Sequence, residues 1–88
     1  MKNIKRNFAE ALEIPEEIVL NLPLITMTGR ERLVVENYKG VIEYDEKQIR
    51  LNTSIGILKI EGESLVLKNI AYESITILGV IKNMEFLI

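Results

Sequence analysis

The sequence has no cysteine, no histidine and no tryptophan among its 88 residues, and aromatic residues make up only 6% of it. Without cysteine, the chain has no disulfide, no thiolate metal ligand and no thiol nucleophile. Without histidine, it also lacks the commonest general base of enzymes. No stretch comes near the ~18–20 apolar residues of a membrane-spanning helix. Cysteine-ligated zinc sites, thiol catalysis and histidine-dependent catalysis are therefore excluded.

The charged residues do not form a surface for polyanions. The net charge is −2, and basic residues cluster only at Lys2, Lys5 and Arg6. Nucleic-acid-binding proteins gain most of their affinity by neutralising phosphates, so we expect no nucleic-acid partner. The basic N-terminus allows at most weak contact with an anionic membrane surface. Acids such as Glu10 and Glu13 interrupt any signal-peptide core, so we expect a soluble intracellular protein.

The remaining polar residues occupy positions where turns are expected. Ser54, Ser64 and Ser74 lie between apolar segments or at the start of one, where serine favours turn hydrogen bonds. The spacing of the acids does not match a calcium loop, and the five glycines are isolated rather than grouped in a phosphate loop. The sequence therefore predicts no catalytic, cofactor-binding or metal-binding residue, and no small-molecule substrate.

What the sequence does contain is an alternation of apolar and polar residues that runs from Leu33 to Ile88. The hydrophobic fraction is 48% and consists mainly of isoleucine, leucine and valine. A period of two is typical of half-buried β-strands. The pattern predicts strands over residues 24–28, 33–36, 41–44, 48–52, 57–61, 65–68, 74–78 and 84–87.

The joints between these strands limit the topology. All of them are short, whereas parallel strands joined through helical crossovers need a dozen or more connecting residues. We therefore expect an all-β fold, an antiparallel meander that forms a small sandwich or roll. The alternative is a β-solenoid, because pairs of apolar residues recur with a seven-residue step, and Gly62 and Gly79 occupy matching positions.

A short helical arm is expected before the β domain. Ile4, Phe8, Ala11 and Leu12 share one stripe of a helix over residues 3–14. A second helical turn is expected after Pro15. It ends at Pro23, because the residue before a proline avoids the helical conformation. We divide the single compact domain into a helical arm, residues 1–23, and a β domain, residues 24–88.

The strongest indication of function is apolar surface at sheet edges. The last strand ends in Phe86-Leu87-Ile88 without a polar tail, and Val66 and Leu78 fall on the face whose other residues are polar. Unpaired strand edges can add strands from another chain. The sequence therefore predicts an assembly protein that forms a homo-oligomer or a hetero-oligomer.

The tyrosines support an alternative function. Tyr44 lies on the apolar face of its strand and is expected in the core, whereas Tyr38 and Tyr72 lie in connections where they could be exposed. Exposed aromatic rings stack on single-stranded bases. A small β-barrel that binds a ligand or nucleic acid is therefore the alternative to an assembly protein.

Four segments, taken in order, resemble the YabP/YqfC family of sporulation proteins, and its YqfC branch in particular. They are Leu-Pro-Leu-Ile-Thr-Met-Thr-Gly at 22–29, Val-Val-Glu-Asn-Tyr-Lys-Gly at 34–40, Ile-Leu-Lys-Ile-Glu-Gly-Glu-Ser-Leu at 57–65 and Ile-x-Ile-x-Gly-x-Ile at 75–81. The similarity covers nearly the whole chain.

The resemblance implies a protein made in the mother cell of an endospore-forming bacterium. It implies a cytoplasmic location, peripheral to the membrane around the forespore, and a membrane protein as partner. It brings no enzyme activity and no cofactor. It also implies that Asn37 and Gly40 shape a turn, and that Glu36 pairs with Arg32 or Lys39 or caps a backbone donor. The candidate interface and turn residues are Glu36, Asn37, Tyr38, Gly40, Leu78 and Phe86.

Overall fold

The computed structural model describes residues 21–87, so the predicted helix over residues 3–14 lies outside the described part of the chain. The described residues form one sheet of six strands. They are β1 (Leu24–Thr28), β2 (Arg32–Glu36), β3 (Gly40–Tyr44), β4 (Gln48–Thr53), β5 (Gly56–Lys68) and β6 (Ser74–Leu87). Every strand pair is antiparallel. The predicted all-β antiparallel fold is confirmed, and the parallel rungs of a β-solenoid are excluded.

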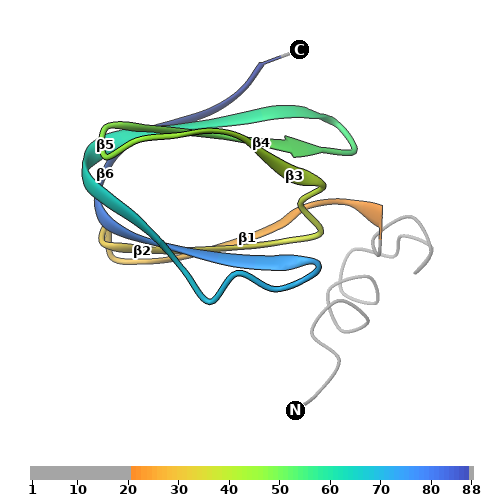
Figure 1. The fold of residues 1–88 in the computed structure, drawn as a ribbon, viewed down its shortest axis with the longest axis horizontal. Helices are drawn as coiled ribbons and strands as arrows, with labels where there is room; N and C mark the ends of the chain where they lie inside the picture. Colours follow the sequence, from red (N-terminus) through yellow and green to blue (C-terminus); the bar gives the residue numbers. More distant parts are fainter. Residues whose placement is uncertain (1–20, 88) are drawn as a thin grey trace.

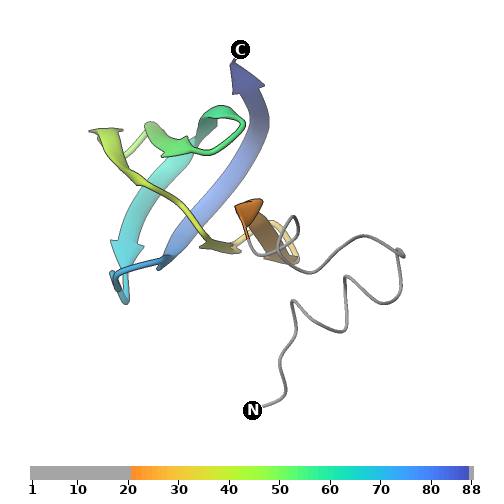
Figure 2. The same ribbon diagram turned by 90° about the vertical axis from the view of Figure 1, so that its right-hand side faces the viewer.

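The sheet rolls up into two layers because β5 and β6 are long and bend (Figure 1). The strand order is β1-β2-β6-β5-β4-β3. One layer holds β1, β2 and the start of β6, and the other holds β3, β4 and the start of β5. The order departs from a simple meander at one place, because β2 pairs with β6 instead of β3. The edge strands β1 and β3 do not pair with each other, so the roll stays open (Figure 2).

The structure has six strands where the sequence pattern predicted eight. The predicted joints 62–64 and 79–83 lie inside β5 and β6, where the pairing shifts register at bulges. Both glycines are needed at this bend for close backbone approach. A Cβ on Gly62 would lie 1.9 Å from the carbonyl oxygen of Val80, and one on Gly79 would lie 2.6 Å from that of Ser64. These glycines therefore mark a bend within paired strands, where the sequence suggested turns.

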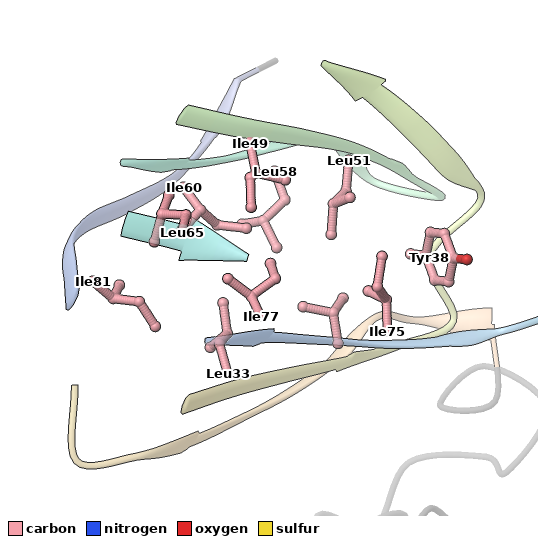
Figure 3. Packing of buried hydrophobic residues seen from close by; sticks show 11 residues of the cluster. Leu33, Tyr38, Ile49, Leu51, Leu58, Ile60, Leu65, Ile75, Ile77 and Ile81 are labelled. Carbon is pink, nitrogen blue, oxygen red and sulfur yellow. The ribbon is translucent and has the colours of Figure 1, made fainter. Parts of the chain in front are cut away.

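The core lies between the two layers and consists of aliphatic side chains together with Tyr38 (Figure 3). Leu33 and Ile77 face it from one layer, and Ile49 and Leu58 face it from the other. The side chains that are almost fully buried are Leu33, Val35, Ile49, Leu51, Leu58, Ile60, Leu65, Ile75 and Ile77. All of them belong to the predicted alternation, which therefore identified the buried face of the sheet.

The expectation that Tyr44 lies in the core is wrong. Tyr44 pairs with the buried Ile49, so it does lie on the inward-facing side of the sheet. However, 48% of its surface is exposed. Because β3 is an edge strand, it has a neighbouring strand on one side only, and its inward side chains are poorly covered.

Candidate interaction surface

The connection between β2 and β3 holds the candidate residues Asn37 and Tyr38, is flanked by the candidates Glu36 and Gly40, and ties the two layers together. Asn37 has φ 67°, in the left-handed region that asparagine tolerates. Its backbone N–H donates to the carbonyl of Glu73 (2.6 Å), and its side-chain Nδ2 donates to the carbonyl of Leu22 (2.8 Å). The backbone N–H of Lys39 donates to the carbonyl of Asn52 in the opposite layer (2.6 Å). Asn37 therefore has a structural role in this connection.

Tyr38 is buried, contrary to the suggestion that it could be exposed. Only 8% of its surface is accessible, and its ring closes the open end of the core (Figure 3). Its hydroxyl donates a hydrogen bond to the backbone carbonyl of Ala71 (2.9 Å). Because the ring is covered, Tyr38 and Tyr72 cannot form the exposed pair of aromatic rings that base stacking would need.

The loop between β5 and β6, residues 69–73, is the most exposed apolar feature among the described residues. Ile70 is 63% exposed and Tyr72 is 91% exposed. Three hydrogen bonds hold the loop: one from the Tyr38 hydroxyl to Ala71, one from the Ala71 N–H to the Ser74 carbonyl (2.8 Å) and the bond from Asn37 to Glu73. The loop therefore presents two large apolar side chains on a fixed backbone. We call this segment the β5–β6 loop.

A small depression lies beside this loop. It is lined by Tyr38, Lys39, Tyr72 and Glu73, and its volume is about 90 Å³. Pockets for drug-sized ligands hold roughly 300–1,000 Å³. The depression is therefore too small to enclose such a ligand, although it can receive part of a side chain from a partner.

The other predicted interface residues lie apart from this loop. Leu78 pairs directly with Val66 on the outer face of the sheet, and Val66 is 40% exposed. The predicted apolar patch on the polar face is thus present, as a single cross-strand pair. Phe86 pairs with the buried Leu58 near the end of β6 and is only partly covered.

Glu36 makes neither of the two ion pairs that the resemblance suggested. Among residues 21–87, the ion pairs are Glu43–Arg50, Glu61–Lys59 and Glu63–Lys82. The contact between Glu63 and Lys82 is the shortest, at 2.6 Å, and it lowers the pKa of the Glu63 carboxyl through a hydrogen bond and through the charge of Lys82. These pairs lie on the exposed surface, where such contacts contribute little to stability.

Among the described acids, Asp45 shapes a turn. The Oδ1 atom of Asp45 accepts hydrogen bonds from the backbone N–H groups of Lys47 (2.7 Å) and Gln48 (2.8 Å), which fixes the β3–β4 turn. Within residues 21–87, no group of three or more acidic side chains is placed to hold a metal ion. In the same range, no helix is long and apolar enough to cross a bilayer.

The sequence analysis suggested that Tyr72 could be exposed, but it missed Ile70. The signal is present in the sequence: the segment Asn-Ile-Ala-Tyr-Glu at 69–73 separates two strands, where turn residues such as glycine or proline are expected. Apolar residues in a connection do not serve turn formation. Their presence between two clear strands is therefore a signal by which the sequence could have drawn attention to this loop.

The comparisons with known proteins agree with the resemblance. The YabP family model matches residues 21–87. The chain is 35% identical over 83 residues to the uncharacterized protein YqfC of Bacillus subtilis (strain 168), an alignment that covers 94% of this chain and 89% of that protein. It is 35% identical over 49 residues to the spore protein YabP of the same organism, covering 56% of this chain and 49% of that protein. The chain belongs to the YabP family.

Proposed function

We propose that this protein acts in spore formation as a non-enzymatic assembly protein, which binds a membrane protein at the envelope around the developing spore. Its relatives support the setting, because one of them is named as a spore protein. In this proposal the protein is on the cytoplasmic side in the mother cell and peripheral to the membrane around the forespore. The β5–β6 loop is the surface that binds the partner.

The exposure of Ile70 and Tyr72 on a fixed loop is the observation that carries the proposal. Large apolar side chains left in water at such a position are typical of interaction sites. Tyrosine is also one of the residues that most often contribute a large share of the binding energy in protein interfaces. A backbone held by hydrogen bonds before binding loses little conformational entropy on binding, which favours affinity.

The surroundings of the loop fit a protein partner. Lys39, Lys68 and Glu73 place charges of both signs near the two apolar side chains. A mixed polar rim around an apolar centre is the usual arrangement of protein interfaces. A nucleic acid would require a surplus of positive charge, and the covered ring of Tyr38 removes one of the two tyrosines on which that alternative was based.

The non-enzymatic part of the proposal is supported by the placement of polar side chains. Asp45 fixes a turn, while Glu43 and Glu63 form ion pairs at the surface. General acid–base catalysis needs a positioned acid or base with a pKa near the working pH. The hydrogen bond and the charge of Lys82 lower the pKa of the Glu63 carboxyl, away from that range.

The test is affinity capture from sporulating cells with matched loop variants. The wild-type protein is compared with the double variant Ile70→Ser and Tyr72→Ser, and with Tyr44→Ser as control, because Tyr44 is an exposed tyrosine outside the loop. We expect one membrane protein to be recovered with the wild type and the control, and about ten-fold less of it with the loop variant. Equal recovery with all three proteins, or no membrane protein at all, would contradict the proposal.

A further inference from the structure

The two edge strands of the sheet differ in how far they are protected against pairing. β3 carries Glu43, is followed by Asp45, and contains a bulge between Val41 and Glu43. β1 has no charged residue, and it pairs with β2 in an uninterrupted register along its whole length. Charged residues and bulges are two of the devices by which edge strands avoid pairing with other chains. β3 has both of them, whereas β1 has neither.

The inner face of β1 is entirely apolar. Ile25 and Met27 lie opposite the buried Val35 and Leu33, so they point inward. Leu24, Thr26 and Thr28 alternate with them and point to the outer face. Met27 is 42% exposed. Within residues 21–87, the apolar inner face of the sheet therefore continues up to the unpaired edge of β1.

We propose that β1 pairs with β1 of a second copy, antiparallel and about a two-fold axis at Thr26. In this arrangement Thr26 lies opposite Thr26 of the second copy. Ile25 lies opposite Met27 of the second copy, and Leu24 lies opposite Thr28 of the second copy. The two six-stranded sheets become one continuous sheet, and the apolar inner face runs across the junction. The interface is isologous, as in most homodimers.

The register follows from the alternation along β1. A slip of one residue would bring the inward Ile25 next to an outward threonine, which mismatches the two faces. A slip of two residues keeps the faces but leaves two residues of each strand unpaired. Only the axis at Thr26 pairs the whole span Leu24–Thr28. Pro23, which has no N–H to donate, then lies outside the paired segment.

A second copy of the chain is the favoured partner for the edge of β1, because β1 is complementary to itself when it pairs antiparallel about the two-fold axis. Under the two-fold axis, apolar residues meet on the inner face and threonines meet at the centre of the outer face, and both kinds of cross-strand pair stabilise sheets. A five-residue strand is only about 17 Å long, so the contact is smaller than a standard interface of about 1,600 Å². We therefore expect a weak dimer that dissociates on dilution.

This inference goes beyond the proposed function and uses a different surface. The membrane partner is assigned to the β5–β6 loop, whereas the second copy is assigned to the edge of β1. Variants in β1 change self-association, and variants at Ile70 and Tyr72 change capture of the membrane protein. Either proposal can therefore fail while the other stands.

The absence of cysteine allows a direct test of the register. In Thr26→Cys, the two introduced thiols face each other across the axis with Cα atoms about 5 Å apart, a distance that a disulfide spans. In the control Thr28→Cys, the two sites are displaced by roughly 13 Å along the strands, which a disulfide cannot span. Under mild oxidation we expect about ten-fold more disulfide-linked dimer from Thr26→Cys. Equal yields from the two variants would overturn the proposed register.

A second pair of variants tests the dimer without oxidation. Thr26→Lys places two like charges opposite each other in the dimer, whereas Thr28→Lys places its lysine opposite Leu24 of the second copy. Like charges directly opposite on neighbouring strands are destabilising. Light scattering over a wide concentration range should show dimer for the wild type and Thr28→Lys, and several-fold weaker association for Thr26→Lys. Circular dichroism checks that both variants fold. A wild-type protein that stays monomeric at every concentration, because another segment or partner occupies β1, overturns the proposal.

Discussion

The hydroxyl of Tyr38 donates a hydrogen bond of 2.9 Å to the carbonyl of Ala71, the residue that separates Ile70 from Tyr72 in the β5–β6 loop. Tyr38 itself is buried at the end of the core. A single side chain therefore joins the hydrophobic core to the loop that we assign to the partner. The position of Ile70 and Tyr72 depends on how well the core fixes this ring.

Removal of this hydroxyl should loosen the loop without unfolding the protein. Tyr38→Phe keeps the ring in the core but leaves the Ala71 carbonyl without its donor. We expect the free energy of unfolding to fall by about 1 kcal/mol in urea titrations. Capture of the membrane protein should weaken as well, because the loop loses one of the three hydrogen bonds that hold it before binding. Tyr44→Phe, at an exposed tyrosine, is the control and should change neither quantity; no change in Tyr38→Phe would show that the bond is dispensable.

Two neighbouring residues of β6 test the assignment of the two faces. Ile77 is fully buried and pairs with Leu33, whereas Leu78 lies on the outer face beside Val66. Ile77→Lys buries a charge in an apolar core and should cost about 4 kcal/mol or more, enough to unfold a domain of this size. Leu78→Lys should cost less, about 1 kcal/mol, because Leu78 is only partly buried and a lysine there can extend its ammonium group to solvent.

Thermal denaturation measured by circular dichroism distinguishes the two variants. The expected result is a folded Leu78→Lys protein and an unfolded Ile77→Lys protein. The reverse order of stability, or equal stability, would mean that the register of β6 is shifted by one residue. Once Leu78→Lys is shown to fold, its effect on partner capture tests whether the Val66–Leu78 pair belongs to the interface.

The buried face of the sheet could be predicted from the sequence, because side-chain alternation depends only on local strand geometry. The alternation places Leu33 and Ile77, for example, in strands, and the two residues pair in the core. The bends could not be predicted in the same way. Gly62 and Gly79 are at positions that suggest turns, and only the closeness of Val80 and Ser64 in space shows why these glycines are required.

The candidate surface was only partly predictable, because the exposure of its side chains depends on contacts between residues that are far apart in the sequence. The prediction that Tyr72 could be exposed agrees with the structure, but the burial of Tyr38 depends on the distant Ala71, 33 positions along the chain. The exposure of Tyr44 depends on β3 being an edge strand, which follows from the pairing order of all six strands. Long-range pairing thus decides which residues of a correctly predicted strand are accessible.

The pH dependence of the Glu63–Lys82 pair gives a further prediction. The hydrogen bond from Lys82, then the charge of Lys82, lower the pKa of Glu63 in the folded state. Because the folded pKa lies below the unfolded one, the contribution of the pair is fully present above the unfolded pKa and is lost as pH falls through the folded pKa. The pair is exposed, so added salt should weaken the shift.

An NMR titration of the Glu63 carboxyl measures this shift directly. Lys82→Met should return the pKa of Glu63 toward its ordinary value. The control Lys59→Met removes the cation that pairs with Glu61, so it should leave the shift of Glu63 in place. An unchanged pKa of Glu63 in Lys82→Met would contradict the assigned cause.

The bend of β5 should be intolerant of any side chain. A Cβ on Gly62 would lie 1.9 Å from the carbonyl oxygen of Val80 and 3.1 Å from the side chain of Leu65. Backbone atoms on a paired strand cannot move aside as a flexible side chain can, so we expect Gly62→Ala to cost about 3 kcal/mol or more. Gly29→Ala is the matched control, since Gly29 has φ 53° but its Cβ would meet only the end of the Glu31 side chain, at 3.7 Å. That variant should cost about 1 kcal/mol, the price of the left-handed conformation alone. Urea denaturation compares the two, and equal losses would show that β5 and β6 do not approach each other this closely at the bend.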